Sequence, residues 1–347
     1  MRKFHLFYKL AIIVSLVIAV QGCKKKSDVN NNVVIETPYG LYFSDTAGAL
    51  FNTNDGTTIK PVVFFADGAT SRAITISGNN LIWVKTNAHV STNDGVNFNP
   101  TYLYINPFSI GQSTILSSTD ENRVYLSSTQ YKGGVVYSDK NGVPGSWQAD
   151  TFSLKLTNPS TFITTFTEMV NNTVVAYDGL NHRIFYRGGK NTEFVEHTNT
   201  TSGTTGKLPA TGIFNLTHLN NTLVAIDPTG GNGAWYSNDT GYTWAQYSGL
   251  PIRPLHCASA PFNQVLLVGT DSFGIYMLNP STNTFTSANA GLSINPVVNG
   301  IVGKEQVYKT GGTIQYIYIA TNKGLYRSQD MGNNWIMVQP GNYVDIY

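Results

Sequence analysis

The chain has 347 residues, of which 41% are hydrophobic, 12% charged and 12% aromatic, with 33 Gly, 14 Pro and 2 Cys. This length accommodates one large domain or two ordinary ones, while the sparse charge and frequent aromatics exclude a disordered acidic tail, a coiled coil and a collagen-like rod. The formal net charge is +2, yet the sequence lacks the basic stripe of nucleic-acid binders, so we expect no nucleic-acid partner.

The first 22 residues have the pattern of an export signal. Three basic residues precede an apolar run of eleven residues from Leu10 to Val20, which is too short to span a bilayer as a mature helix. The run leads into Gln21, Gly22 and Cys23, followed by three lysines. This segment resembles a bacterial lipoprotein signal, although Gln21 stands where a small or apolar residue is usual. The resemblance implies removal of residues 1–22 and lipidation of Cys23. The alternative is an ordinary secretory signal cleaved nearby, with Cys23 incidental.

A mature chain of this kind would carry 19 basic and 20 acidic residues, a formal charge of −1. Residues 24–36 are polar and without periodicity, so we predict that residues 23–36 form a lipidated flexible tether. Lipidation of Cys23 leaves Cys257 alone, which predicts no intrachain disulfide and favours a small buried residue over a nucleophile. We expect a monomer in the cell envelope, anchored to a membrane by its N-terminal lipid. We expect the anchoring membrane to be the outer membrane, and the sequence leaves both its periplasmic and its surface face open as the location of the domain.

The rest of the chain repeats a short pattern of strands. A β-rich run, a turn with Gly or Asn, and a second β run ending in an aromatic recur without any sustained helical periodicity. Clear copies begin at Val124, Leu223 and Ile317, and weaker copies begin at residues 41, 81, 174 and 265, so the gaps are 40 to 52 residues. That period is typical of β-propellers, because a closed ring of sheets covers the faces that one sheet exposes. We predict an all-β fold, a single propeller over residues 37–347 with seven four-stranded blades; six or eight blades are compatible with the weaker copies.

The turn after the second run is a recognisable octapeptide. Residues 237–244 read S-N-D-T-G-Y-T-W, residues 328–335 read S-Q-D-M-G-N-N-W, and residues 91–98 keep the spacing with Asn and Phe substitutions. Fainter traces lie at residues 52–56 and 138–147. These copies resemble Asp-box (BNR) repeats, which occur in sialidase-like and sortilin-like propellers. The defining positions are Ser237, Asp239, Gly241, Trp244, Ser328, Asp330, Gly332, Trp335, Ser91, Asn93, Gly95 and Phe98.

The chemistry of this box is structural. Its Asp or Asn can accept backbone N–H bonds, its Gly supplies a positive φ, and its aromatic ring is worth roughly 2–3 kcal/mol when buried. The resemblance implies that the boxes lie at the outer rim, away from an active site. We therefore assign no catalytic role to Asp239 or Asp330.

A sialidase-like activity is the sharpest enzymatic alternative. A sialidase resemblance would require three arginines that bind the carboxylate of the substrate. The N-terminal arginine motif of the family is missing, and residues 182–185 match it only in part. Arg187 and Arg327 each follow the aromatic of a repeated strand, so we predict that both face solvent. Another glycosidase would need two carboxylates roughly 5–10 Å apart across a cleft. We assign no catalytic residue, and glycoside hydrolysis stays the alternative to binding.

One set of polar residues shares a position in the repeat. Asp45, Asp178, Asp227 and Asp271 each follow the first run of their repeat, so we expect them in equivalent loops on one rim. His89, Lys132, His182 and Lys323 are assigned to the same class of loop. A ring of carboxylates can bind a cation or a sugar, but Asp also favours tight turns, where it binds its own backbone.

Metal, phosphate and nucleotide motifs are absent from the sequence, so we predict no metal site and no cofactor. The predicted function is a non-catalytic binding or scaffolding module for a glycan or an envelope or extracellular protein, with the eight rim residues as candidate ligand contacts.

Overall fold

The computed structural model describes residues 35–37, 40–65, 69–104, 114–118, 122–128, 134–150, 161–190, 192–197, 207–309 and 311–347. Cys23, Lys132, the predicted signal and most of the predicted tether lie outside these residues. The described part of the chain contains no α-helix and one short 3₁₀ turn, Pro261–Asn263. None of its elements is a helix with the length and apolar character needed to cross a membrane.

The chain divides into two compact units. The smaller comprises residues 1–38 and 306–314, and its described part pairs β1 (Ile35–Thr37) with Tyr308 and Val307 in antiparallel register. Strand β1 thus begins two residues before the predicted boundary at residue 37. The larger unit comprises residues 39–305 and 315–347.

The larger unit consists of seven four-stranded antiparallel blades. Blade 1 contains β29 (Tyr343–Ile346), β2 (Leu41–Asp45), β3 (Ala49–Thr53) and β4 (Lys60–Phe64). Blade 2 contains β5 (Ala73–Ser77), β6 (Asn80–Val84), β7 (Asn87–Ser91) and β8 (Asn99–Tyr104). Blade 3 contains β9 (Ile115–Ser118), β10 (Arg123–Ser127), β11 (Val135–Ser138) and β12 (Gln148–Ala149).

Blade 4 contains β13 (Ile163–Glu168), β14 (Val174–Asp178), β15 (Arg183–Arg187) and β16 (Val195–Glu196). Blade 5 contains β17 (Asn215–Leu219), β18 (Thr222–Ile226), β19 (Ala234–Ser237) and β20 (Ala245–Gln246). Blade 6 contains β21 (Leu255–Ser259), β22 (Leu267–Thr270), β23 (Ile275–Asn279) and β24 (Thr284–Ser287). Blade 7 contains β25 (Val298–Tyr308), β26 (Thr313–Thr321), β27 (Gly324–Ser328) and β28 (Ile336–Pro340).

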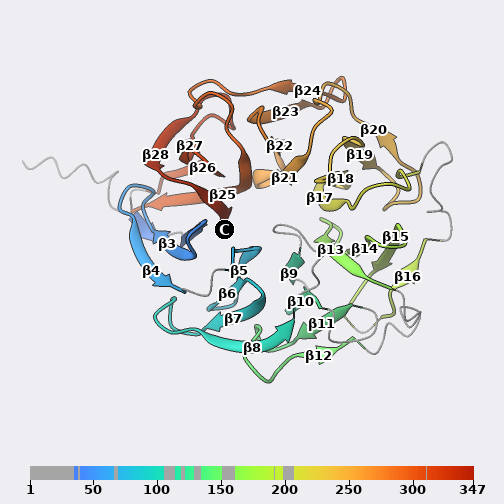
Figure 1. The fold of residues 1–347 in the computed structure, drawn as a ribbon, viewed down its shortest axis with the longest axis horizontal. Helices are drawn as coiled ribbons and strands as arrows, with labels where there is room; N and C mark the ends of the chain where they lie inside the picture. Colours follow the sequence, from blue (N-terminus) through green and yellow to red (C-terminus); the bar gives the residue numbers. More distant parts are fainter. Residues whose placement is uncertain are drawn as a thin grey trace, which may run out of the picture. The chain divides into compact units, whose positions relative to one another are not determined.

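The blades follow one another around a ring (Figure 1). Six of the seven predicted repeat starts lie in the second strand of a blade, and the start at residue 265 lies two residues before it. The prediction of seven four-stranded blades is confirmed. The ring closes because the last strand of the chain, β29, is the inner strand of blade 1 beside β2. The two ends of the larger unit are therefore joined by hydrogen bonds in one sheet.

Antiparallel pairing sorts the connections onto two faces. The connections from the second to the third strand of a blade emerge on the same face as those from the fourth strand to the next blade; we call this the loop face. The remaining connections, including the Asp boxes between third and fourth strands, emerge on the opposite face, which we call the box face. The predicted rim residues and the predicted boxes are thus on opposite faces wherever they occupy these connections.

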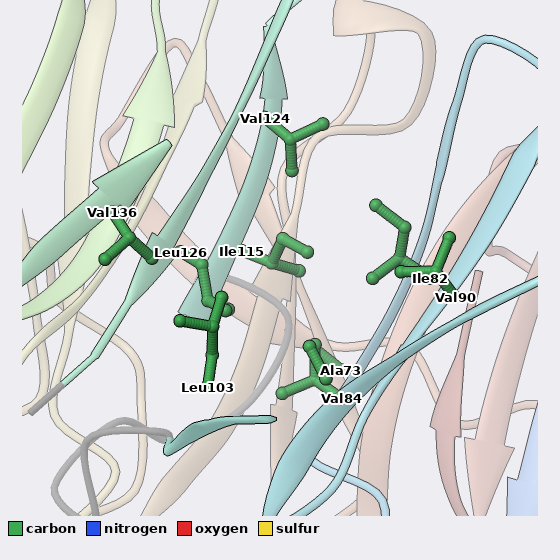
Figure 2. Close-up of a cluster of buried hydrophobic side chains, with 10 residues drawn as sticks. Ala73, Ile82, Val84, Val90, Leu103, Ile115, Val124, Leu126 and Val136 are labelled. Carbon is green, nitrogen blue, oxygen red and sulfur yellow. The ribbon is translucent and has the colours of Figure 1, made fainter. Parts of the chain in front are cut away.

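Apolar side chains fill the seven interfaces between neighbouring blades. One cluster joins blades 2 and 3 through residues such as Ile82, Val84, Leu126 and Val136, all of which are fully buried (Figure 2). The middle strands are covered on both faces, which explains runs such as residues 80–84, where every residue is buried. The sheets therefore cover each other's faces, as the repeat pattern predicts.

Each Asp box folds around its first residue. In residues 237–244, the Ser237 hydroxyl accepts from the backbone N–H of Gly241 at 2.8 Å and donates to Asp239 at 2.7 Å. Asp239 accepts from the backbone and hydroxyl of Thr243, and Gly241 has φ +101°. Trp244 is buried in the interface of blades 4 and 5. Similar hydrogen bonds occur at Ser328, Asp330, Gly332, Asn334, Ser91, Asn93, Gly95 and Asn97, and Trp335 is buried likewise.

The prediction that Arg187 faces solvent is wrong. Its side chain is completely buried and its Nη1 lies 3.0 Å from Oδ2 of Asp150, which is also buried. The guanidinium stacks between the rings of Tyr125 and Phe194, at 4.8 and 4.6 Å from the ring centroids. The prediction failed because Arg187 takes the register position that the buried serines Ser237 and Ser328 hold in other blades. Blade 3 supplies an acid and an aromatic that accommodate the guanidinium there.

Candidate functional site

The four predicted rim aspartates all lie at the end of the second strand of a blade or directly after it, on the loop face. Asp45 and Asp178 end β2 and β14, while Asp227 and Asp271 come directly after β18 and β22. His182 lies in the turn before β15, and Lys323 lies in the turn between β26 and β27.

His89 is the exception, and its predicted loop position is wrong. The turn between β6 and β7 contains only residues 85 and 86, so His89 falls inside β7, opposite Trp83. Its ring lies 5.2 Å from that of Phe65. His89 is therefore part of the packing between strands.

Asp178 is completely buried and holds its own loop together. Its Oδ1 accepts from the backbone N–H groups of Leu180 and Asn181 at 3.1 and 3.0 Å. Its Oδ2 accepts from Nε and Nη2 of Arg183 at 3.1 and 2.7 Å. Since both oxygens are engaged, Asp178 fixes the loop and leaves little capacity for a ligand.

Asp227 does the same in blade 5. It is completely buried, and its Oδ1 accepts from the backbone and hydroxyl of Thr229 at 2.8 and 2.6 Å. Its Oδ2 accepts from the backbone and side chain of Asn232 at 3.2 and 2.7 Å. The loops after β14 and β18 are thus both held rigid by hydrogen bonds to a buried aspartate, and we call these loops the two walls.

These two walls border a pocket of about 350 Å³, which we call the loop-face pocket. Its surface is mainly apolar, and it is lined by Phe162, Thr164, Gly179, Leu180, His182, Gly212, Ile213 and Thr229. The close approach of the walls depends on Gly179, where a Cβ would lie 2.8 Å from Thr164 and 3.0 Å from Ile213. A pocket with these features suits an apolar side chain of a partner better than an ion.

The other predicted rim residues lie elsewhere. Asp45 accepts from the backbone N–H groups of Ala47 and Ala49 in blade 1, and Asp271 accepts from Ser272 in blade 6. Lys323 belongs to blade 7. Of the eight predicted residues, the structure brings Asp178, His182 and Asp227 to the borders of the loop-face pocket, and the rest are distributed over other blades or lie outside the described residues.

The polar contact at the pocket is between Tyr177 and His182. The Tyr177 hydroxyl lies 2.9 Å from Nδ1 of His182. Burial lowers the pKa of His182, while the charge of Asp178 opposes this shift. Burial, followed by the charge of Asp178, raises the pKa of Tyr177. Both side chains are therefore neutral at pH 7, which preserves the apolar character of the pocket.

We predict that the protein loses stability as the pH falls below about 6.5. Burial lowers the pKa values of His182, His197 and His218 in the folded state. The unfolded chain then binds more protons just below its histidine pKa, so the free energy of unfolding falls with falling pH. Urea unfolding at pH 7.5 and 5.5 measures this, and a higher midpoint at pH 5.5 would contradict it. The carboxylates held by hydrogen bonds, such as Asp239, act only at lower pH because their pKa values are lowered.

Three arginines are engaged by carboxylates of the chain itself. Arg123 binds Asp139 at 2.7 Å, Arg183 binds Asp178, and Arg187 binds Asp150. Arg183, the arginine within residues 182–185, donates to Asp178 and to the Thr161 hydroxyl, 2.6 Å away. Among the described residues, no three His, Cys, Asp or Glu side chains are grouped so that they could hold a metal ion.

The apolar lining was missed by sequence reasoning. Phe162, Leu180 and Ile213 lie in three different connections, and nothing in their spacing marks them as neighbours. The available signal is a Gly followed by an apolar residue at 179–180 and again at 212–213, which is weak by itself. Their proximity follows only from the packing of blade 4 on blade 5.

Comparison with solved structures gives β-propellers. YCF48 from Cyanidioschyzon merolae aligns with a TM-score of 0.53 and 14% identity over 78% of this chain and 84% of that chain. YCF48 bound to D1 peptide aligns with a TM-score of 0.53 and 13% identity over 84% and 94%. Virginiamycin B lyase from Staphylococcus aureus aligns with a TM-score of 0.53 and 16% identity over 85% and 93%.

A further match is the extracellular domain of the putative hybrid two-component system BT3049 from B. thetaiotaomicron, with a TM-score of 0.52 and 14% identity. It covers 78% of this chain and 35% of the longer one. No protein-family model and no curated protein matches the sequence. At these identities the likeness concerns the fold alone, and the matches include both a lyase and a protein solved with a bound peptide, so function must be argued from the site.

Proposed function

We propose that the chain is a lipid-anchored, extracytoplasmic β-propeller that binds a segment of a protein partner on its loop face. The observation that carries the proposal is the loop-face pocket, a mainly apolar hollow between two loops that Asp178 and Asp227 hold rigid. A preformed apolar hollow of this kind receives one apolar side chain at small entropic cost.

The surrounding loop face supports this assignment. Leu180, Ile252, Phe273 and Ile294 lie in loop-face connections of blades 4 to 7, and their exposed fractions are 52%, 84%, 42% and 85%. Arg253 lies over the Phe273 ring, 5.7 Å from its centroid. Exposed apolar side chains such as Val96 and Val170 also lie on the box face, so these residues support the assignment through the pocket that they accompany and not through exposure by itself.

Hydrolysis has less support than binding. A glycosidase needs one carboxylate that stays protonated and one that is free to act. At the loop-face pocket both Asp178 and Asp227 are completely buried and accept several hydrogen bonds from their own loops. The few polar groups of the lining also favour an apolar protein side chain over a glycan.

The proposed cellular location rests on the sequence. The basic start, the apolar run and Cys23 favour lipidation at that cysteine and placement in the cell envelope, with the outer membrane as the expected membrane. Similarity in fold to YCF48, one structure of which holds a D1 peptide, and to the extracellular domain of BT3049 is compatible with a protein ligand outside the cytoplasm.

Peptide display on the purified full chain tests the proposal. We predict that the selected peptides share an apolar anchor residue and that Leu180→Asp weakens their binding at least tenfold, because the pocket would then carry a charge against an apolar group. Val170→Asp is the matched control, since Val170 is 51% exposed on the box face and Leu180 is 52% exposed. Equal binding of the peptides by the wild type and Leu180→Asp would reject the pocket as the site. Selective binding of the same purified chain to neutral glycans would favour the glycan-binding hypothesis.

A further inference from the structure

Lys304 has surroundings that differ from those of the exposed lysines. It lies on β25, the inner strand of blade 7, and its side chain is mostly withdrawn from solvent, whereas Lys323 of the same blade stands exposed in a turn. The Lys304 ammonium lies over the ring of Tyr347, 4.5 Å from the ring centroid. An aromatic ring thus covers one side of this amine.

No carboxylate neutralises Lys304 within the described part of the chain. Glu305, the next residue of β25, is exposed, and its Oε1 accepts from Nε2 of Gln315 at 2.8 Å. Asp345, two residues before Tyr347 on β29, is buried and its Oδ2 accepts from the Ser71 hydroxyl at 2.8 Å. Both nearby acids are therefore engaged by other side chains, and the withdrawn ammonium lacks an opposite charge.

The amine nevertheless remains accessible. Its Nζ makes no hydrogen bond within the described structure, and it is not one of the unpartnered side-chain nitrogens that are sealed from solvent. Val302, two residues earlier on β25, and Tyr347 also belong to the lining of a cavity of about 270 Å³ among the inner strands. Space for a small molecule thus exists beside this part of β25.

These surroundings make Lys304 a nucleophile. Withdrawal from water without a compensating charge disfavours the ammonium form, and it lowers the pKa of Lys304 from 10.5 to about 8. At pH 7.5 roughly a quarter of the side chains are then neutral amine, against roughly 0.1% for a lysine of ordinary pKa. A neutral lysine amine attacks carbonyl carbon, which the ammonium form does not do.

We propose that Lys304 is a covalent attachment site for small aldehydes. The neutral amine forms a bond to the carbonyl carbon, and a proton moves from the nitrogen to the carbonyl oxygen. Loss of that hydroxyl together with the second nitrogen proton, as water, leaves an imine at Nζ. The step requires no oxidant or reductant. The site is independent of the loop-face pocket and of the proposed protein partner.

Reductive alkylation of the purified full chain with limiting acetaldehyde and cyanoborohydride tests the proposal, because the reductant converts the imine into a stable ethyl group. Peptide mass spectrometry gives the rate at each lysine. At pH 7.5 we expect Lys304 to react at least tenfold faster than Lys323, and the ratio of the two rates to fall as the pH rises to 9.5. Equal or slower reaction of Lys304, or a ratio independent of pH, would overturn the proposal.

Three variants separate the chemistry of the amine from its mere presence. Lys304→Arg should abolish the fast reaction and leave the rate at Lys323 unchanged. Tyr347→Glu places a carboxylate beside the ammonium and favours its charged form, so we expect the rate ratio at pH 7.5 to fall at least tenfold relative to Tyr347→Leu, which adds no charge. Equal ratios in the two Tyr347 variants would contradict an amine activated by its uncharged surroundings.

Discussion

Replacing Arg187 by Met is expected to lower the free energy of unfolding by about 3–5 kcal/mol. The substitution leaves the buried Asp150 carboxylate without the guanidinium that lies 3.0 Å away, in a place from which water is excluded. It also removes the cation from between the rings of Tyr125 and Phe194. Urea unfolding of the two proteins at pH 7.5 measures the difference.

Two companion variants separate the charge from the packing. Arg327→Met alters an arginine of the third strand of blade 7 that lies one register position before the equivalent of Arg187. Its guanidinium stacks on Tyr316 at 4.7 Å and its side chain is half-buried, so a much smaller loss is expected. The double variant Arg187→Met with Asp150→Leu should recover most of the lost stability, because no buried charge is left. A double variant as unstable as Arg187→Met would show that packing, and not the uncompensated carboxylate, determines the loss.

Asp178→Ala is expected to lower the free energy of unfolding by about 3 kcal/mol. Its fully buried carboxylate accepts two backbone N–H bonds and two bonds from Arg183, and their loss leaves the Arg183 guanidinium without its main partner. Because the same loop forms one wall of the loop-face pocket, binding of display-selected peptides should fall as well.

Asp271→Ala is the matched control for this prediction. Asp271 occupies the equivalent loop of blade 6, but it is partly exposed and its contacts include Ser272 and the backbone. We expect its stability to change by less than about 0.5 kcal/mol and peptide binding to stay unchanged. A larger effect of Asp271→Ala than of Asp178→Ala would contradict the assignment of Asp178 as the residue that holds the loop.

The repeat pattern predicted most of the fold for a simple reason. The middle strands of each blade are covered on both faces, so they appear in the sequence as short apolar runs that recur once per blade. The second strands β6, β10 and β18 could therefore be located from composition and turn residues alone. The short outer strands, such as β16 with two residues, leave hardly any local signal.

Long-range packing set the limit of sequence reasoning. Closure of the ring by β29 beside β2 joins residues about three hundred positions apart, and neither strand carries a mark of that pairing. The ion pair of Arg187 with Asp150 and the convergence of Leu180 with Ile213 likewise depend on contacts between different blades or connections.

The predicted rim aspartates illustrate the difference between position and role. Sequence spacing placed all four in loop-face connections, and the structure has them there. Their hydrogen bonds to their own loops favour the structural interpretation for Asp45, Asp178 and Asp227, whose oxygens serve backbone N–H groups. The same bonds give the loop-face pocket its rigid walls.

Site-specific photo-crosslinking in cells that make the full chain tests the central claim most directly. A photoreactive residue at position 180, in the loop-face pocket, is compared with one at position 170, on the box face. We predict one discrete protein adduct at position 180 that disappears when Ile213→Asp is introduced in the same chain, and no such adduct at position 170. Adducts at position 170 alone, or an adduct at position 180 that survives Ile213→Asp, would contradict protein binding through this pocket.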